Sequence, residues 1–451
     1  MIRSSYFSGK RYAVLGLARS GLAAAETLLA SGAEVVVWDR QDKAREALAG
    51  RARIADPLTL DLAGFDGVVV SPGVPLNAHP IAAHARAAGV PVIGDIELFA
   101  LARADLPAHQ VIGITGTNGK STTTALVHHL LENAGVPSLM GGNIGLPILA
   151  QEPLAEGGVY VLELSSYQID LTYSLACDAA ALTNITPDHL DRYDGFEGYA
   201  ASKARLFAMQ EAEQFAVFGC ADAPTDVIAE AERQRREAGR AVCADKRALA
   251  SRQPDWPSLQ GPHNLENAAI AVALVEAVGL TRAQAEAGLA SFAGLAHRME
   301  RLGEHGGVLF INDSKATNPA STAPALAAFP PDPQRRIHWI VGGLPKTDDL
   351  GECAAFFGNV AAAYTIGEAG PLFAELLEPV THVERCEMLS EATARAIKAA
   401  QPGDVILFSP ACASFDQFRD YEVRGDAFRE IVGALTGEAA HRVAFAGRSA
   451  A

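Results

Sequence analysis

The stretch GITGTNGKST, from Gly113 to Thr122, gives the strongest indication of fold in this chain. The apolar run Val111–Ile114 predicts a strand that leads into a glycine-rich bend, and a helix is expected to begin where the bend ends, at Lys120 and Ser121. Backbone N–H groups in such a bend, together with the positive end of the helix dipole, converge on phosphate oxygens. We therefore expect a polyphosphate-binding loop in an α/β fold, with an ordinary strand-to-helix turn as the alternative.

Residues of this loop have distinct expected roles. The Lys120 ammonium group is expected near the β- and γ-phosphates, and the Ser121 hydroxyl is suited to bind Mg²⁺. The spacing departs from the strict G-x-x-x-x-G-K-[ST] pattern, because Ile114 occupies the position of the first glycine and the nearest glycine is Gly113. The residues expected to surround the phosphates are Gly116, Thr117, Asn118, Gly119, Lys120, Ser121 and Thr122.

The composition limits the classes of function. A chain of 451 residues that is 49% hydrophobic can form two to four domains with ample core. Its formal net charge of −16 argues against a polyanion-binding surface, so nucleic acid is not expected as a partner. No apolar stretch reaches the roughly 18 residues that a membrane-spanning helix needs, and no signal-peptide pattern follows the basic residues near the start of the chain. We therefore expect a cytoplasmic, soluble protein without membrane insertion.

The cysteines are not arranged in C-x-x-C pairs. This distribution favours free buried thiols in a reducing compartment over a disulfide framework or a zinc site. The six cysteines are Cys177, Cys220, Cys243, Cys353, Cys386 and Cys412.

The first segment begins with a βαβ pattern. The turn GLARSG, Gly16 to Gly21, is similar to the G-x-G-x-x-G dinucleotide fingerprint, but Ala18 replaces the middle glycine. Asp39 lies where a ribose-binding acid is expected, yet the replaced glycine disfavours a nicotinamide cofactor, and a purely structural turn remains an alternative. A second loop, Ser71–Gly73, follows a strand end where open α/β sheets bind ligands. The expected strands are residues 12–16, 34–38 and 68–70, and the expected helix is residues 20–30.

The second segment contains the glycine-rich loop, its helix to about residue 134, and an apolar strand, Val159–Leu162, with Glu163 at the tip. Glu163 is either a solvated strand-end carboxylate or a Mg²⁺ ligand, and the neighbouring phosphate loop favours the metal role. His189 and Asp191 share one short loop, where the histidine is either structural or serves as a Mg²⁺ ligand or general base.

Helical spacing of apolar residues indicates a helix over residues 262–280. Asn264 and Asn267 lie near its start, where they either cap the helix or hydrogen-bond a base such as adenine, and the sequence leaves both interpretations open. Lys203 lies on an earlier expected helix and, by residue type alone, is a solvated charge.

The third segment again alternates strands and helices. Asp313, Lys315, Lys346 and Ser414 follow three of its strands, and they are expected in one crevice with Arg298 because the ends of parallel strands collect ligands. Each of them alone could equally be a surface charge or a turn residue. The expected strands are residues 308–311, 337–341, 364–366 and 405–408, and the polar loops are residues 312–318, 342–349 and 409–418.

Seven motifs along the chain together resemble those of the Mur ligase family, and the similarity runs essentially from end to end. They are GTNGKST at 116–122, SSYQ at 165–168, HLDR at 189–192, HN at 263–264, HR at 297–298, NDSKATN at 312–318 and SPACASFDQF at 409–418. Within the family, GLARSG, SPG at 71–73, GDIELF at 94–99 and NDSKATN are most similar to the motifs of members that add D-glutamate to UDP-N-acetylmuramoyl-L-alanine.

The resemblance implies an α/β protein of three domains. These are a Rossmann-like UDP-sugar-binding domain (residues 1–98), a central ATP-binding domain of the P-loop ATPase type with a mixed sheet (99–294), and a Rossmann-like amino-acid-binding domain (295–451). It also implies ATP as substrate and two Mg²⁺ sites, with Lys203 carbamylated by CO₂ to become a metal ligand. We expect the protein to act as a monomer.

The resemblance also assigns residues to roles. The UDP-sugar is expected at Arg19, Ser20, Asp39, Arg40, Ser71, Pro72, Gly73 and Asn143. Beyond the phosphate loop, ATP is expected at Asn264, Asn267, Arg298 and Asp313. The metal ligands would be Ser121, Glu163, His189 and Lys203, and the catalytic residues Lys120, His189, Arg298 and Asn143. D-Glutamate is expected at Lys315, Thr317, Lys346, Ser414 and Tyr421, the last of which is usually phenylalanine in this subfamily.

Taken together, these implications predict ATP-driven amide formation through an acyl phosphate. The alternatives are a family member that uses another amino acid or a folate acceptor, a kinase or NTP-driven switch, a non-catalytic nucleotide-binding module and a nicotinamide oxidoreductase.

Overall fold

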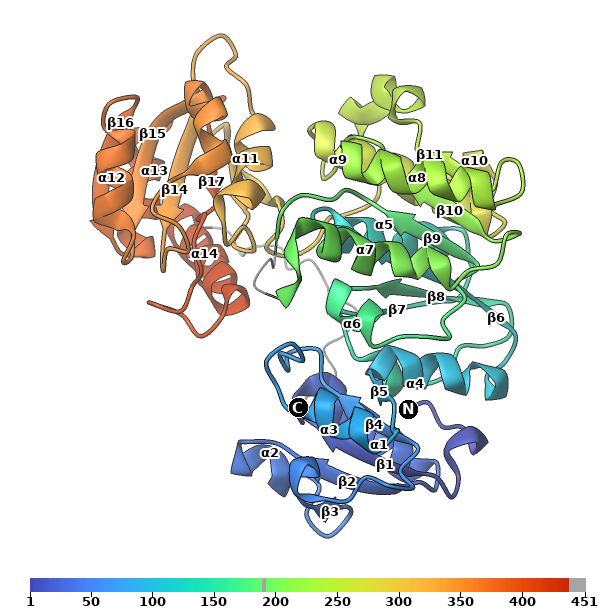
Figure 1. Cartoon of the computed structure of the whole chain (residues 1–451). Helices are drawn as coiled ribbons and strands as arrows, with labels where there is room; N and C mark the ends of the chain where they lie inside the picture. The colour runs from blue at the N-terminus through green and yellow to red at the C-terminus, as the bar shows by residue number, and fades with distance from the viewer. Residues whose placement is uncertain (189–191, 438–451) are drawn as a thin grey trace. The chain divides into compact units, whose positions relative to one another are not determined.

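The computed structural model describes residues 1–188 and 192–437 and contains three α/β sheets (Figure 1). Internal contacts divide the chain into two compact units. The first unit comprises Met1–Ala248 and Glu266–Leu289 and holds two sheets, and the second comprises Leu249–Leu265 and the chain from Ala290 onward and holds the third. The three-domain boundaries at 98/99 and 294/295 stay a prediction.

The first sheet is entirely parallel, with the strand order β3-β2-β1-β4-β5. Successive residues of β1 belong to two different apolar clusters: Tyr12 and Val14 pack with helices α1 and α4, whereas Ala13 and Leu15 pack with α3. Apolar side chains on both faces of a strand are typical of a parallel sheet covered by helices. The elements are β1 Arg11–Leu15, α1 Arg19–Ala30, β2 Glu34–Trp38, α2 Asp42–Glu46, β3 Arg53–Ile54, β4 Gly67–Val70, α3 Ile81–Ala87, β5 Val92–Ile93 and α4 Asp95–Ala102.

The second sheet has the order β11-β10-β9-β6-β8-β7, and every described strand pair in it is parallel. The expectation of a mixed sheet in the central segment is therefore wrong for the described residues, because each strand returns through a crossover segment that keeps the strand direction. The elements are β6 His109–Thr115, α5 Lys120–Asn133, β7 Ser138–Gly142, β8 Gly158–Glu163, α6 Ser166–Asp170, β9 Ala179–Leu182, α7 Gly195–Ala208, β10 Phe215–Phe218, α8 Ala223–Arg235, β11 Ala241–Cys243, α9 Pro262–Ala277 and α10 Arg282–Ala287.

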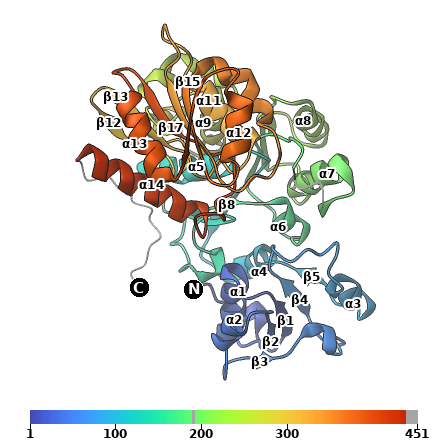
Figure 2. The ribbon, with the colours of Figure 1, turned by 90° about the vertical axis from the view of Figure 1, so that its left-hand side faces the viewer.

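The third sheet has the order β12-β13-β17-β14-β15-β16, with only β12 antiparallel among its described strands. Residues of α11 and α12 pack on one face and residues of α13 and α14 on the other, and α13 lies beside α14 (Figure 2). The elements are β12 Glu300–His305, β13 Val308–Asn312, α11 Pro319–Ala327, β14 Ile337–Gly342, β15 Val360–Ile366, α12 Gly370–Leu377, β16 His382–Glu387, α13 Leu389–Ala399, β17 Val405–Phe408 and α14 Tyr421–Thr436.

The strands expected from apolar runs are confirmed. Strands β2 and β17 have the expected bounds, and the remaining expected strands agree within a few residues at each end. The polar loops at residues 312–318, 342–349 and 409–418 follow β13, β14 and β17, which are neighbours in the third sheet and run parallel to one another. These loops therefore emerge at the same edge of the sheet.

Two of the cysteines correct the expectation of free thiols. Cys220 and Cys243 form a disulfide, with their Cα atoms 5.7 Å apart, because adjacent strands β10 and β11 bring the two side chains together. Cys177, Cys353, Cys386 and Cys412 are free and buried. Among the described residues, no helix combines the length and apolar character needed to cross a membrane.

Candidate functional site

The glycine-rich loop joins the end of β6 to the start of α5, as expected. Gly116 has φ +143°, and Gly119, the residue before α5, has φ +84°. A Cβ atom at Gly116 would overlap Thr183 Oγ1, and one at Gly119 would overlap Asn267 Oδ1. Both positions therefore require glycine for conformation and for space.

Residues at the end of β9 hold this loop in place. The Thr117 N–H donates to Asn184 O (2.8 Å), and the Asn118 N–H donates to Asn184 Oδ1 (2.9 Å). Thr183 Oγ1 donates to Asn118 O (2.6 Å). No role was expected for Thr183 or Asn184, because only the adjacency of β9 and β6 brings them to the loop.

The first turn of α5 carries the expected phosphate and metal residues. Lys120 Nζ donates to Gly116 O (3.0 Å) and to Thr117 O (2.8 Å), which places the ammonium group over the loop. Ser121 is buried, and Thr122 is half-buried. The charge, the hydroxyl and the helix N-terminus thus lie together, as a phosphate site requires.

Glu163 lies at the end of β8, directly beside the strand that feeds the loop. Asn143 ties this carboxylate to the next loop: its side-chain amide donates to Glu163 Oε1 (2.9 Å) and its backbone N–H to Glu163 O (2.8 Å). The other oxygen, Glu163 Oε2, is buried and has no hydrogen-bond partner among the described residues. A buried, unpaired carboxylate oxygen next to a phosphate loop fits a hard divalent cation.

Lys203 is not the solvated charge that its residue type suggested. Its side chain, on α7, is buried, donates from Nζ to Gly116 O (2.8 Å) and lies 4.4 Å from the centre of the Tyr199 ring. Burial, followed by the nearby charge of Lys120, lowers its pKa well below the usual value. The neutral amine is therefore easier to form here than on an exposed lysine.

His189 and Asp191, which we expected beside this site, lie outside the described residues. The next residue, Arg192, donates to Val74 O (3.1 Å), and its guanidinium lies 4.4 Å from the centre of the Tyr167 ring. Arg192 and Tyr167 also line a cavity of about 600 Å³ that reaches Pro72.

The GLARSG turn is organised by Asp39. This carboxylate accepts from the backbone N–H of Leu17 (2.7 Å) and of Gln41 (2.8 Å), so it holds the turn that follows β1. Gly16 has φ +88°, and a Cβ atom there would lie 2.9 Å from Ser71 Cβ. The loops after β1, β2 and β4 therefore meet at one edge of the first sheet.

The other expected UDP-sugar residues lie around this edge. Arg19 begins α1 and its guanidinium donates to Gly145 O, which belongs to the same loop as Asn143. Ser20 is half-buried and Arg40 is exposed. Ser71 and Pro72 are half-buried, and Gly73 is exposed.

Asp313, in the second unit, is buried and hydrogen-bonded. It accepts from Ser409 Oγ (2.6 Å) and from the Met299 N–H (3.1 Å). Burial raises the pKa of this carboxyl to about 7 despite those bonds. The hydrogen bond between Ser409 and Asp313 thus joins the loop after β17 to the loop after β13.

Four of the residues expected at the amino-acid end lie on the loops after β13, β14 and β17, and the fifth, Tyr421, begins α14. Lys315 Nζ lies 4.0 Å from the centre of the Tyr421 ring, and Lys346 Nζ donates to Thr317 Oγ1 (3.4 Å). Ser414 is buried at the tip that follows β17. The structure thus brings two pairs of expected residues into contact within this unit.

Arg424, on α14, was missed by the sequence analysis. It is buried, and its guanidinium donates to Ala413 O (3.0 Å), Ser314 O (2.8 Å) and Cys412 O (3.0 Å). These acceptors belong to the loops after β13 and β17, so one side chain fixes two loops that carry expected ligands. Only its position on the first turn of α14, after the SPACASFDQF motif, hinted at such a role.

The remaining nucleotide residues fall in different units. Asn267 belongs to the first unit and contacts the phosphate loop, whereas Asn264 belongs to the second and donates to Gln260 O (3.1 Å). Arg298 is half-buried and follows His297, which has φ +62°. Their roles toward adenine and the γ-phosphate stay predictions.

Family comparisons agree with this geometry. Three family models match the chain: the Mur ligase MurD-like N-terminal domain at residues 10–94, the Mur ligase middle domain at 114–253 and the Mur ligase glutamate ligase domain at 297–412. The matches include the GLARSG turn, the phosphate loop and, in the third sheet, the loops after β13 and β14.

Individual relatives are similar along nearly their whole length. UDP-N-acetylmuramoylalanine--D-glutamate ligase of Novosphingobium aromaticivorans is 68% identical over 96% of this chain and 97% of its own. The enzyme of the same name from Sphingopyxis alaskensis is 61% identical over 96% of this chain and 100% of its own. The solved structure of MurF ligase from Thermotoga maritima in complex with ADP shares the fold at 16% identity, with a TM-score of 0.57 over 95% of each chain. The chain belongs to the Mur ligase family.

Proposed function

We propose that this protein is an ATP-dependent ligase that joins D-glutamate to UDP-N-acetylmuramoyl-L-alanine in peptidoglycan precursor synthesis and releases ADP and phosphate. The observation that carries the proposal is the 68% identity, over 96% of the chain, to a ligase named for this reaction. The phosphate loop and the strand-end loops of the third sheet support it independently.

The reaction needs chemical activation. A carboxylate is a poor electrophile, so the alanyl carboxylate must first gain a good leaving group. We propose that this carboxylate attacks the γ-phosphate of ATP in line, which forms an acyl phosphate and releases ADP. The amine of D-glutamate then attacks the acyl carbon, loses a proton and expels phosphate. His189 or a metal-bound group is the proposed acceptor of that proton.

Positively charged residues and backbone donors stabilise the phosphoryl group during transfer. The backbone N–H groups of residues 119–122, at the start of α5, and the Lys120 ammonium group would face the phosphates, and Arg298 is assigned to the γ-phosphate. Asn143 is assigned to the reacting carboxylate, and its hydrogen bond to Glu163, a proposed metal ligand, supports that assignment. Asn264, Asn267 and Asp313 are assigned to the nucleoside.

Two Mg²⁺ sites are proposed. Ser121 and Glu163 would form the first, where the unpaired Glu163 Oε2 suits the cation, and His189 with carbamylated Lys203 would form the second. When bound, Mg²⁺ supplies charge neutralisation to the phosphate oxygens.

The surroundings of Lys203 favour carbamylation. The reaction requires the neutral amine, which attacks CO₂ and releases one proton to give a carbamate anion. The lowered pKa of Lys203 makes that amine available, and the anion would replace a buried cation beside Lys120 with an opposite charge. Lys203→Ala should lose most ligase activity, and short-chain carboxylic acids should restore part of it. Equal activity of this variant with and without the acids would argue against the carbamate.

The UDP-sugar is assigned to the loops of the first sheet, and D-glutamate to the loops of the third sheet. Arg19, Ser20, Asp39, Arg40 and Ser71–Gly73 would bind the UDP-sugar at the edge of the first sheet. The D-glutamate carboxylates would meet the residues of the third sheet's loops, where cationic side chains provide local charge in an acidic protein. Those residues are Lys315, Thr317, Lys346, Ser414 and Tyr421.

Phosphate release tests the proposal directly. The protein is incubated with UDP-N-acetylmuramoyl-L-alanine and Mg-ATP, with and without D-glutamate, and with other amino acids as controls. Phosphate release that depends on D-glutamate supports the proposal. Release without any amino acid would instead indicate an NTPase, and release with a different amino acid alone would indicate another specificity.

A further inference from the structure

The Cys220–Cys243 disulfide lies at the carboxyl edge of the second sheet. Phe218 of β10 pairs with Cys243 of β11, and Cys220 follows two residues after Phe218. Strand β11 is one of the two edge strands of this sheet, is three residues long and, among the described strands, pairs with β10 alone. The disulfide is therefore the covalent link that holds a short edge strand to its neighbour.

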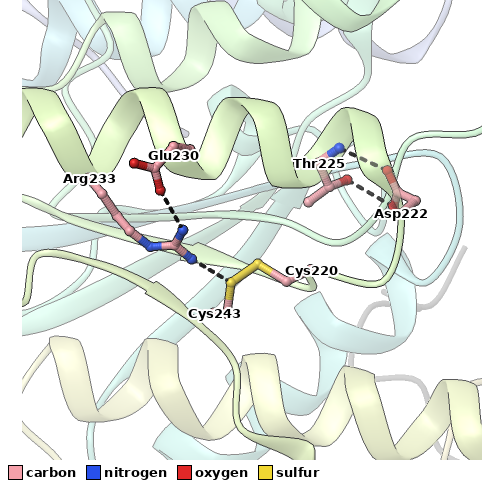
Figure 3. The surroundings of a disulfide bond; sticks show 6 residues. All are labelled: Cys220, Asp222, Thr225, Glu230, Arg233 and Cys243. Atoms are coloured by element: carbon pink, nitrogen blue, oxygen red, sulfur yellow. Dashed lines mark hydrogen bonds and ion pairs between the residues drawn. A yellow bond between two sulfur atoms is a disulfide. The ribbon is translucent and has the colours of Figure 1, made fainter.

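The two sulfur atoms are accessible to exchange chemistry. Cys243 is exposed and Cys220 is half-buried. Figure 3 shows the guanidinium of Arg233 between Glu230 and the disulfide, with Nη2 2.7 Å from Cys243 Sγ and Nη1 3.1 Å from Glu230 Oε2. A guanidinium at this position stabilises a thiolate on Cys243 when the disulfide opens.

Next to Cys220, Gly219 contacts Thr183, a residue that holds the phosphate loop. Gly219 packs so closely on Thr183 that a Cβ atom there would overlap Thr183 O. Thr183 in turn donates to Asn118 O of the phosphate loop (2.6 Å). A change in the backbone at Cys220 is therefore passed to residue 118 through two packed contacts.

On the Cys243 side, a second route reaches the same loop. Lys246, three residues after Cys243, forms an ion pair with Glu266 (3.0 Å). The next residue, Asn267, accepts from Thr123 Oγ1 of α5 (3.3 Å) and lies against Gly119. Both cysteines are thus connected, through a few residues each, to side chains that contact the phosphate loop.

The backbone of Cys220 is strained, which indicates how the structure would change on reduction. Its φ of +49° lies in the left-handed region, which is unfavourable for a residue with a side chain. A disulfide restricts the conformations open to the backbone of its cysteines, so its reduction would allow Cys220 to relax. We propose that Cys220–Cys243 is a reversible thiol–disulfide site, and that its reduction loosens the phosphate loop and weakens nucleotide binding; the proposal rests on the proposed ATP site.

The exchange is balanced with an external thiol as reductant. A thiolate attacks Cys220 Sγ, the S–S bond breaks, and Cys243 leaves as a thiolate beside Arg233. A second thiolate then attacks the sulfur of the external thiol in the mixed disulfide and releases Cys220 as a thiolate. In total, one protein disulfide and two thiols give two protein thiols and one small disulfide. The reverse reaction uses that small disulfide as oxidant.

Titration of Mg-ATP into full-length protein, followed by calorimetry, tests the proposal. Oxidised protein is compared with protein reduced by dithiothreitol, and the thiol content of each is confirmed by alkylation and mass spectrometry. We expect the Kd to rise about fivefold on reduction, at the low end of couplings between linked sites. The double variant Cys220→Ser/Cys243→Ser should bind like reduced wild-type protein with or without dithiothreitol. It keeps the four free cysteines, so it controls for effects of the reductant elsewhere.

A second variant tests the chemistry at Arg233. Arg233→Gln should leave the Kd of the oxidised protein unchanged and slow its reduction by dithiothreitol severalfold, because the leaving thiolate loses its cation. Equal Kd values for oxidised and reduced wild-type protein, or a reductant effect that persists in the double variant, would overturn the redox proposal alone. Absence of ATP binding in every form would overturn the ATP site and the redox proposal with it.

Discussion

Two glycine substitutions at opposite ends of α5 separate backbone strain from damage to the phosphate loop. Gly119 precedes the helix with φ +84°, and Gly135 follows it with φ +78°. A Cβ atom at Gly135 would meet nothing within 4 Å, whereas one at Gly119 would overlap Asn267 Oδ1 and lie 3.3 Å from Asn267 Cγ. Gly119→Ala and Gly135→Ala thus impose similar strain but different contacts.

The structure gives a magnitude for each variant. An L-residue in the left-handed region costs about 1 kcal/mol, so both variants should lose about that much stability. Gly119→Ala must also displace Asn267, which loses the hydrogen bond from Thr123, for about 1 kcal/mol more. If the displaced loop loses one hydrogen bond to a charged phosphate, ATP binding weakens by about 2 kcal/mol, or roughly 30-fold in Kd.

Calorimetry with Mg-ATP and thermal melting measure both effects on the same preparations. Gly135→Ala should melt earlier than wild-type protein and keep its Kd for ATP. Gly119→Ala should melt earlier still and bind ATP roughly 30-fold more weakly. Both variants carry similar backbone strain, and only Gly119→Ala should disturb the phosphate loop. Equal Kd values for the two variants would therefore refute the assignment of Gly119 to the phosphate site.

Three further variants test other parts of the structure. Arg424→Lys should lower the free energy of unfolding by about 3 kcal/mol, because an ammonium group lacks the planar geometry with which the guanidinium reaches three carbonyls. The same variant should raise the KM for D-glutamate more than the KM for ATP. Denaturant titration measures the first effect, and steady-state kinetics measures the second. Asp313 has a pKa of about 7 when folded against an ordinary 3.8, so the folded state holds its proton more tightly and this contribution to stability is lost as pH rises from about 4 to about 7. Asp313→Asn should flatten that part of the curve of melting temperature against pH, and an unchanged slope would contradict the burial argument. The pair Cys220→Ser/Cys243→Ser should lower the free energy of unfolding of oxidised protein by about 3 kcal/mol, as expected for a crosslink that spans 23 residues, and an equal loss in reduced wild-type protein is the control.

Sequence patterns predicted the strands and the positions of the polar loops at their ends well, and the reason is physical. Buried parallel strands are short runs of apolar residues, so β2 and β17 could be placed from such runs in the sequence. Glycines with positive φ and a lysine at a helix start leave an equally local signature, which is why the phosphate loop was identified without a structure. Both kinds of feature depend on residues close together in the chain.

Features that depend on distant residues were missed or wrong. Cys220 and Cys243 were expected to be free because no short spacing joins them, yet β10 and β11 are neighbours in the sheet. Lys203 was taken for a solvated charge because burial of a helix face depends on what packs against it. Sequence spacing carries no information on such contacts, whereas the strand order determines them.

In each unit, a residue distant in sequence holds loops that carry expected ligand residues. In the first unit, Asn184 receives hydrogen bonds from two successive residues of the phosphate loop, and in the second, Arg424 donates to carbonyls of two loops from different strands. Asn184, through its backbone O and its side chain, and Arg424, through its side chain, therefore fix backbone groups of loops that follow other strands, and neither needs a ligand to do so. A loop already fixed in this way loses less conformational entropy when a ligand binds. Asn184 and Arg424, to which we assign no ligand, thus hold loops that carry expected ligand residues, and substitutions at either position should weaken binding through the order of the free protein.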